Sequence, residues 1–253
     1  MTFTDTHTHP YYNEDATGFV QRAIDAGVTR MIMPNVDAES IHPMKKLCAQ
    51  FPDNLRMAMG LHPTEVKENA DKVLETVAKE LFSGEKYVAV GEIGIDLYWD
   101  ITFREKQMEI FDMQLNMAEK MNLPVIIHCR NGLDETLEVL GSHKGLSTVF
   151  HSFGGTTVDV ERILSAGDNN YIGINGIITF KNSSLKDVVP AIPSERLLLE
   201  TDSPYLAPVP YRGRLNESAY LPYIAKKIAE SLKKDVEEVA ETTTENSHRL
   251  FGF

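Results

Sequence analysis

Short apolar runs alternate with longer stretches of helical periodicity along the chain, and this alternation limits the possible folds more than any other sequence feature. Several runs are apolar throughout, as at residues 87–90 and 124–127. Such runs are typical of parallel strands that helices cover on both faces. Eight strands alternating with helices within 253 residues favour a closed barrel over an open sheet. We therefore predict the α/β class and a single (β/α)₈ TIM barrel that spans residues 1–253 as one domain.

The expected elements follow one another without a linker or an internal repeat. Strands are expected at residues 2–7, 30–35, 56–62, 87–94, 124–130, 147–153, 170–177 and 197–202. Helices are expected at residues 14–26, 39–50, 71–81, 103–121, 133–140, 158–166, 185–191, 217–233 and 236–250.

Composition and charge narrow the class of function. The net charge of −12 argues against broad adhesion to nucleic acid or acidic membranes, although it leaves room for a local basic rim. Two cysteines, Cys48 and Cys129, form no disulfide framework. We see neither a targeting segment nor a run long enough to span a membrane, so we expect a cytoplasmic protein. No feature indicates an obligate protein partner.

Metal-capable side chains interrupt the apolar strands near their C-terminal ends. They are His7 and His9 on the first strand, His62 on the third, Glu92 on the fourth, His128 on the fifth, His151 on the sixth and Asp202 on the eighth. In a barrel of parallel strands these ends meet at one rim, where such barrels carry their chemistry. His7 and His9 are two residues apart, so both imidazoles point to the same side of an extended strand.

Six of these side chains, all except His62, are candidate metal ligands. Six ligands are too many for one tetrahedral ion but suit two divalent ions. We assign His7, His9 and Asp202 to one ion, His128 and His151 to the other, and Glu92 to a bridging position. We expect Glu92 and Asp202 to be catalytic, Asp202 by moving the proton of the attacking water. Imidazole and carboxylate together suit zinc, manganese or iron, and magnesium less naturally.

The chain resembles the TatD family of metal-dependent deoxyribonucleases, within the amidohydrolase superfamily. The resemblance rests on Asp5-Thr6-His7-Thr8-His9, Gly60-Leu61-His62-Pro63, Gly91-Glu92-Ile93-Gly94-Ile95-Asp96, Pro124-Val125-Ile126-Ile127-His128-Cys129-Arg130, Phe150-His151-Ser152-Phe153, Leu198-Leu199-Glu200-Thr201-Asp202-Ser203-Pro204-Tyr205-Leu206 and Thr243-Thr244-Glu245-Asn246. It implies a metal-dependent hydrolase barrel, divalent metals at the six positions above, and hydrolysis of DNA phosphodiesters, often as a 3′-end exonuclease.

Three loops depart from the usual family pattern. The chain has Asp96-Leu97-Tyr98-Trp99 where family members often read Leu-Asp-Tyr-Tyr, and Arg130-Asn131-Gly132 where Arg-Asp-Ala is usual. It also has Arg214-Leu215-Asn216-Glu217-Ser218 where Arg-Asn-Glu-Pro is common. Because these loops border the predicted pocket, the departures bear on the substrate more than on the metals.

A phosphodiester substrate needs hydrogen-bonding or cationic partners beyond the metals. We predict His62, Arg130 and Arg212 as substrate-binding residues. Arg214 follows the eighth strand with Arg212, where barrel enzymes commonly bind phosphate, and Lys181 is a weaker candidate. Among the aromatic residues of the rim loops, Phe153 and Phe180 are expected to pack onto the barrel. Trp99 is the candidate for stacking on an unpaired base, and Tyr98 lies beside it.

The leading hypothesis is a two-metal phosphodiesterase that acts on DNA, as single strands or at 3′ ends. A second keeps the metals but hydrolyses an amide, ester or lactone, for example as a deacylase on a small or tRNA-linked substrate. A third is a non-enzymatic metal-binding or regulatory protein. The polymerase-and-histidinol-phosphatase type of barrel also opens with His-x-His, but the segment from Thr201 to Pro204 fits TatD better.

Overall fold

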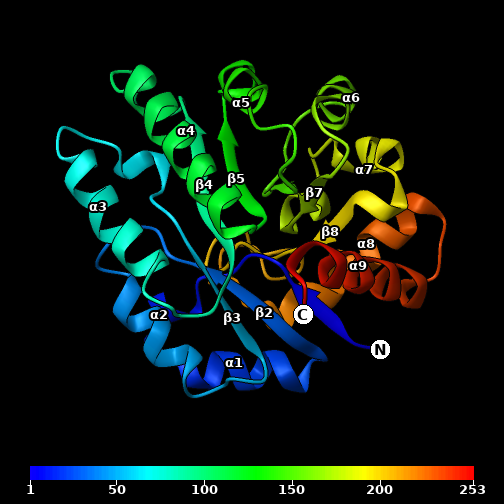
Figure 1. Ribbon diagram of the computed structural model, residues 1–253. Coiled ribbons are helices and arrows are strands. Elements are labelled where there is room, and N and C mark those ends of the chain that lie inside the picture. Colours follow the sequence, from blue (N-terminus) through cyan, green and yellow to red (C-terminus); the bar gives the residue numbers. More distant parts are fainter.

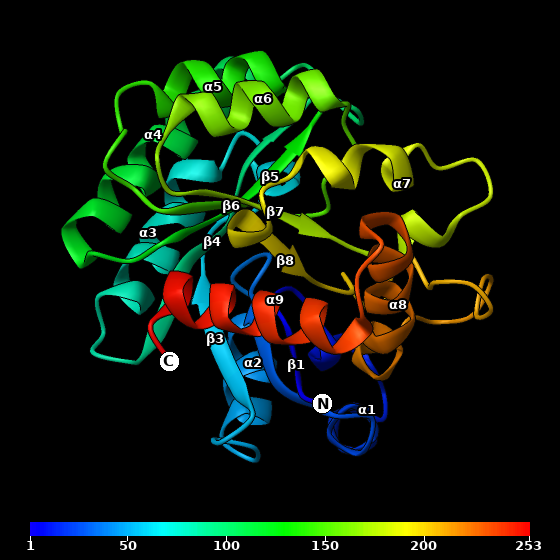
Figure 2. The same cartoon turned by 90° about the vertical axis from the view of Figure 1, so that its right-hand side faces the viewer.

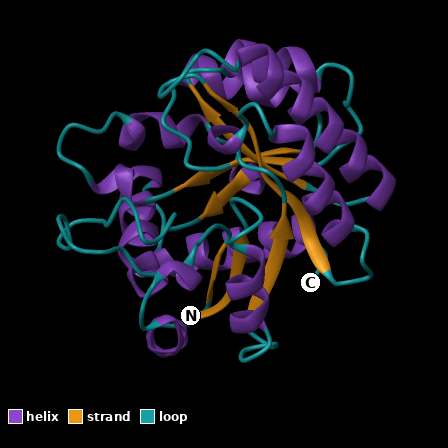
Figure 3. Ribbon diagram, turned by 90° about the vertical axis from the view of Figure 1, so that its left-hand side faces the viewer, coloured by secondary structure: helices purple, strands orange, loops and turns teal.

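The central feature of the protein is a ring of eight parallel strands surrounded by helices (Figures 1 and 3). The computed structural model describes residues 1–253. The strands lie in sequence order around the sheet, β1 to β8, and each is hydrogen-bonded in parallel to the next. They are β1 (Phe3–Asp5), β2 (Val28–Pro34), β3 (Leu55–Met59), β4 (Tyr87–Asp96), β5 (Val125–Arg130), β6 (Thr148–Phe150), β7 (Asn170–Ile174) and β8 (Leu197–Leu199).

Helices follow the strands and cover the outer face of the sheet (Figure 3). They are α1 (Ala16–Asp25), α2 (Ile41–Cys48), α3 (Ala70–Leu81), α4 (Arg104–Met121), α5 (Leu133–Leu140), α6 (Thr157–Ala166), α7 (Leu185–Val188), α8 (Leu221–Leu232) and α9 (Val236–Phe251). None of them is both long enough and apolar enough to cross a membrane.

Backbone hydrogen bonds between the segments that contain β1 and β8 close the ring. The Thr6 N–H donates to the Leu199 carbonyl at 3.0 Å, and the Asp202 N–H donates to the His7 carbonyl at 2.9 Å. Farther along, the His9 N–H donates to the Ser203 carbonyl at 2.8 Å. The predicted (β/α)₈ barrel is therefore confirmed.

Six of the eight predicted strands were too long at their C-terminal ends, whereas β5 ends at Arg130 as predicted and β4 extends two residues farther, to Asp96. β1 ends at Asp5 and β6 at Phe150, so His7, His9 and His151 lie in the loops that follow rather than on the strands. β8 likewise ends before Asp202. The loops after β1 and β8 still run parallel to each other, because Thr8 and Ser203 form a parallel backbone bridge. Their side chains therefore still reach the open end of the barrel.

The last helix closes the opposite end of the barrel. Figure 2 shows α9 lying across the strands. Its residues Leu250 and Phe251 are buried against the side chains that fill the barrel interior, namely Ile32, Ala58, Ala89, Ile126, Val149, Tyr171 and Leu198. A larger apolar core joins the strands to the surrounding helices. With one end filled by apolar side chains, only the end formed by the C-terminal ends of the strands is open to a substrate.

Candidate metal centre

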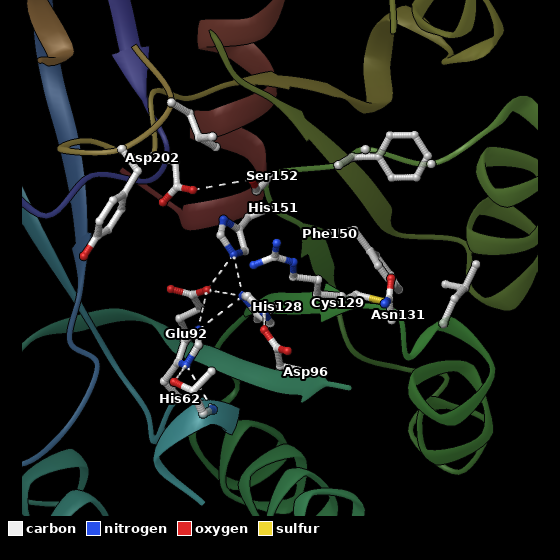
Figure 4. Close-up of a pocket in the computed structure, with 18 of the residues that line it drawn as sticks. His62, Glu92, Asp96, His128, Cys129, Asn131, Phe150, His151, Ser152 and Asp202 are labelled. Carbon is white, nitrogen blue, oxygen red and sulfur yellow. Dashed lines mark hydrogen bonds and ion pairs between the residues drawn. The ribbon is translucent and has the colours of Figure 1, made fainter. Parts of the chain in front are cut away.

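The side chains predicted to bind metal converge at the C-terminal end of the barrel. Figure 4 shows four of them, Glu92, His128, His151 and Asp202. His7 is fully buried, and Glu92 is 3% exposed. His7 and His9 direct their Nε2 atoms to within 3.1 Å of each other. The ring of His151 stacks on that of His7, with centroids 3.8 Å apart. Residues from the first, fourth, fifth, sixth and eighth strand ends thus form one compact cluster.

Glu92 lies at the middle of this cluster, and its two carboxylate oxygens face different histidines. Oε2 lies 3.1 Å from His7 Nε2 and 3.8 Å from His9 Nε2. Oε1 lies 2.7 Å from His128 Nδ1 and 2.6 Å from His151 Nε2. One carboxylate therefore connects two groups of imidazole nitrogens.

Asp202 lies on the His7 and His9 side of the cluster. Its Oδ1 is 3.9 Å from the Nε2 atoms of both histidines. The Ser152 hydroxyl lies 3.4 Å from Asp202 Oδ2 and accepts a hydrogen bond of 2.7 Å from the Asn175 amide. The Asp202 side chain is 15% exposed, so it borders the open cavity while the histidines beneath it are buried.

Hydrogen-bond partners outside the cluster fix which ring nitrogen of His9 carries the proton. Nδ1 of His9 lies 3.2 Å from the Pro34 carbonyl and 2.8 Å from the Tyr11 hydroxyl, which itself donates to that carbonyl. A carbonyl only accepts, so the proton of His9 belongs on Nδ1. Nε2 then carries a lone pair aimed into the cluster.

His128 is held in the opposite tautomer by Asp96. Its Nε2 lies 2.9 Å from Asp96 Oδ2, a carboxylate oxygen that accepts the ring proton. Nδ1 is left with a lone pair, and it faces Glu92 Oε1. A histidine that donates its other ring N–H to a carboxylate is the usual arrangement of a metal ligand.

The pKa values show how strongly these groups interact. Burial raises the pKa of Asp202 to about 7. Burial also raises the pKa of Glu92, but His151, His62 and His7 together outweigh it and hold that pKa well below its usual range. For His151, burial lowers the pKa, but the Glu92 carboxylate outweighs burial and raises it to about 10.

The donor atoms fit divalent cations. A divalent cation placed between imidazole nitrogens and carboxylate oxygens takes the place of the ring protons that otherwise join them. Three overlapping groups have ligand atoms close enough to share an ion: His7 with Glu92 and His151, His7 with His9 and Asp202, and His62 with Glu92 and His128. The cluster is therefore able to bind metal.

His62 belongs to the cluster by distance but differs from the other histidines in its hydrogen bonding. Its Nε2 lies 3.1 Å from Glu92 Oε1 and 3.2 Å from His128 Nδ1. The backbone N–H of Thr64 donates to Nδ1 at 3.2 Å, which makes Nδ1 an acceptor, and the Thr64 hydroxyl, 2.7 Å from the same atom, then donates to it as well. Burial lowers the pKa of His62, which keeps the ring neutral with its one proton on Nε2. This histidine therefore presents an N–H donor to the site.

The cluster forms the floor of a cavity of about 1150 Å³. Arg130 and Arg162 are the only arginine or lysine residues that line it, while its acidic residues outside the cluster include Glu65, Asp134 and Asp159. Arg162 is paired with Asp134 at 2.5 Å. Arg130 has no carboxylate partner, and the walls of the cavity are therefore mainly acidic.

The other predicted substrate contacts divide into two groups. Arg130 lines the cavity with Trp99, and Phe153 is buried in the core as expected. The structure does not bring Arg212 to the cavity wall, because its guanidinium lies 3.8 Å from the ring centroid of Phe180 and its Nη1 donates to the Ala207 carbonyl. Arg214 and Lys181 do not line the cavity either.

Asp96 and Glu200 are residues of the site to which sequence reasoning gave no role. Asp96 lies four residues after Glu92 on β4, and Glu200 lies two before Asp202, so the period of two places each on the same face as a recognised residue. Glu200 Oε1 accepts a hydrogen bond from the Ser152 N–H and lies 3.7 Å from His151 Nδ1. Burial raises the pKa of Glu200 to about 8. The alternation of side chains along an extended segment could therefore have identified Asp96 and Glu200 from the sequence.

A closed (β/α)₈ barrel whose open end buries histidines and carboxylates able to bind metal has the architecture of a metal-dependent hydrolase. The comparison with known families agrees with this class and is more specific. The sequence model of the TatD-related DNase family matches residues 4–252, and the chain belongs to that family.

Relatives of known sequence or structure span nearly the whole chain. The uncharacterized metal-dependent hydrolase YabD of Bacillus subtilis is 35% identical over 98% of this chain and 98% of its own length. The 3'-5' ssDNA/RNA exonuclease TatD of Erwinia tasmaniensis is 32% identical over 97% of this chain and 96% of its own length. YJJV, a TatD homolog from Escherichia coli, has a crystal structure that superposes on this one with a TM-score of 0.92. The superposition covers 99% of this chain and 98% of YJJV, and the two sequences are 32% identical.

Proposed function

We propose that this protein hydrolyses phosphodiester bonds at the 3′ ends of single-stranded DNA with two divalent cations. The observation that carries the proposal is the position of Glu92, whose two oxygens face two separate groups of imidazole nitrogens. The name of the Erwinia tasmaniensis relative, an ssDNA/RNA exonuclease, supports the choice of substrate.

In this proposal each side of Glu92 holds one cation. His7, His9 and Asp202 would hold one cation, His128 and His151 would hold the other, and Glu92 would serve both. Divalent cations bound there would lower the pKa of the attacking water and neutralise charge on the phosphoryl oxygens. Zinc and manganese suit these donors, and magnesium less well.

The side chains that border the cavity have separate roles. Asp202 is the group that accepts the proton of the attacking water, because its side chain is 15% exposed to the cavity whereas that of Glu92 is 4% exposed. His62 donates its Nε2–H to a phosphoryl oxygen, since Thr64 fixes its tautomer. Arg130 pairs with a phosphate through a guanidinium that no carboxylate occupies.

The test is a metal-reconstituted assay on single-stranded DNA with free and with blocked 3′ ends. We expect metal-dependent release of nucleotides from free ends only, and a loss of at least about 100-fold in His128→Ala, because even outer partners of metal ligands contribute 10- to 100-fold. The matched control is His42→Ala, since His42 is an exposed histidine on α2, away from the site. Full activity in His128→Ala would refute the proposal.

A second candidate function is hydrolysis of an acyl ester, amide or lactone at the same centre. The acidic walls of the cavity favour it, because Glu65, Asp134 and Asp159 repel a polyanion. A panel of acyl substrates in the same assay separates the two candidates. Turnover of acyl substrates without release of nucleotides would select the second, and tight metal binding without turnover of either class would indicate a non-enzymatic protein.

A further inference from the structure

The loop after β4 carries an aromatic pair at the edge of the cavity. Trp99 is 70% exposed and lines the cavity, and Tyr98 beside it is 53% exposed. The two rings meet edge to face, with centroids 4.9 Å apart. Large exposed aromatic side chains beside a catalytic cavity leave their flat faces available to a ligand.

Arg130 completes this surface from the neighbouring strand end. Its guanidinium lies 3.7 Å from the ring centroid of Tyr98 and 5.3 Å from that of Trp99. These contacts hold the guanidinium in place while leaving its N–H donors free, because Arg130 has no carboxylate partner. Arg162, the other arginine of the cavity, is already paired with Asp134. An anionic ligand is therefore attracted to the side of the cavity where Trp99 lies.

Asp96 ties this aromatic surface to the metal centre. Its Oδ1 accepts hydrogen bonds from the backbone N–H groups of Tyr98, at 3.0 Å, and Trp99, at 3.4 Å. Its Oδ2 lies 2.9 Å from Nε2 of His128. One buried carboxylate thus fixes both the turn that carries Trp99 and a histidine of the metal cluster.

We propose that Trp99 and Arg130 form a nucleotide subsite beside the metal centre, in which Trp99 stacks on an unpaired base and Arg130 binds the phosphate attached to it. The proposal rests on the proposed function and names the part of the substrate that this side of the cavity recognises. Stacking on one exposed face requires a base that is free of a partner strand. The subsite thus selects single-stranded ends without selecting a sequence.

The fluorescence of Trp99 provides a direct test, because it is the only tryptophan of the chain. The metal-reconstituted protein is titrated with a single-stranded DNA pentamer whose phosphorothioate linkages resist hydrolysis, and with the same pentamer lacking its bases. We expect the pentamer with bases to quench the fluorescence and to bind about 5- to 150-fold more tightly, the ratio that corresponds to 1–3 kcal/mol of stacking.

Variants separate the base contact from the phosphate contact. Anisotropy of a labelled pentamer should show that Trp99→Ala loses the preference for bases, and that Trp99→Phe restores most of it. Arg130→Gln should weaken binding of both pentamers equally, because both retain their phosphates. Ile101→Ala is the control, since Ile101 is 69% exposed and lies two residues from Trp99 but does not line the cavity.

The outcomes distinguish failure of the subsite from failure of the proposed function. An unchanged preference for bases in Trp99→Ala would overturn the subsite, even if the protein hydrolyses ordinary DNA. Quenching that depends on the bases, in a protein that releases no nucleotide from any DNA, would support the subsite and refute the proposed function alone.

Discussion

At the residue scale, the chemistry of the metal centre depends on where each histidine carries its proton. The Pro34 carbonyl places the proton of His9 on Nδ1, and Asp96 places that of His128 on Nε2. The Thr64 N–H places that of His62 on Nε2. His9 and His128 thus aim lone pairs into the cluster, whereas His62 aims an N–H donor. These three histidines have different chemistry because of their partners outside the cluster.

Substitution of Asp96 by asparagine should disturb the centre without removing any proposed ligand. An amide facing Nε2 of His128 can donate to it, which favours the tautomer with the proton on Nδ1 and removes the lone pair aimed at the cluster. We expect about 10- to 100-fold weaker metal affinity and a similar loss of activity, measured by calorimetric metal titration and by nucleotide release. Asp100→Asn, an exposed change in the same loop, should alter neither. Unchanged metal affinity in Asp96→Asn would contradict this assignment.

At the element scale, two glycines of β4 leave no room for a side chain between β4 and β5 where these strands carry Glu92 and His128. A Cβ atom on Gly94 would lie 2.1 Å from the His128 carbonyl oxygen, and the φ of Gly94 is +139°. A Cβ on Gly91 would meet Ile126 in the same way. Glycine at these positions lets the two strands approach each other next to the cluster.

Gly94→Ala should therefore move β5 away from β4 and displace His128. We expect a loss of about 1–3 kcal/mol in the free energy of unfolding from overcrowding, measured by urea denaturation, together with weaker metal binding. Gly84→Ala is the matched control. Gly84 also has a positive φ, +94°, but no atom lies within 4 Å of the added Cβ. The control should lose about 1 kcal/mol with unchanged metal binding, and equal effects of the two substitutions would contradict the explanation.

Helix α4 is linked to the loop between α5 and β6 by His143. Its Nδ1 lies 2.8 Å from Glu119 Oε1, and its Nε2 lies 3.0 Å from Asp112 Oδ1. Burial lowers the pKa of His143, but the hydrogen bonds to Asp112 and Glu119 outweigh burial and raise the pKa above its usual value. Because the pKa is higher in the folded state, the stabilisation is fully present below about pH 6.5 and is lost as the pH rises through the raised value.

His143→Gln should abolish this part of the pH dependence. The difference in the free energy of unfolding between wild type and variant should be largest near pH 6 and should shrink toward about pH 9, as measured by urea denaturation across that range. Subtracting the free energy of unfolding of one protein from that of the other cancels the contribution of the metal cluster, because the cluster titrates in both proteins. A difference that stays constant with pH would show that folding does not raise the pKa of His143.

The alternation of strands and helices could be predicted from the sequence, because strands buried on both faces must be apolar throughout. The residues of the cluster could also be predicted, because histidines and carboxylates stand out at the ends of such strands. The position of Arg212 could not, because the course of a loop depends on contacts such as that with Phe180, which has no periodic signal. The tautomer of His62 was likewise hidden, since it depends on a backbone N–H.

At the scale of the whole molecule, the barrel confines the chemistry to one end, and the charge limits what can bind there. α9 fills the other end with Leu250 and Phe251, so a substrate or a metal ion could enter only through the opposite opening. The net charge of −12 repels a polyanion from most of the surface. Under the proposed function, a DNA strand would therefore be attracted only where Arg130 and bound cations outweigh that charge.

This balance predicts a shallow salt dependence of DNA binding. Because binding releases counterions, each phosphate that the protein neutralises lowers the logarithm of the affinity by about 0.7 for a tenfold rise in salt. A single phosphate contact through Arg130 therefore predicts about 2- to 3-fold weaker binding at 200 mM than at 50 mM salt. Anisotropy titrations of the phosphorothioate pentamer over this range measure the slope, and Arg130→Gln should flatten it. A loss of about 1000-fold, typical of six or more phosphate contacts, would reveal a basic surface outside the cavity. A flat slope in the wild type would show that Arg130 pairs with no phosphate and would favour the uncharged acyl substrate.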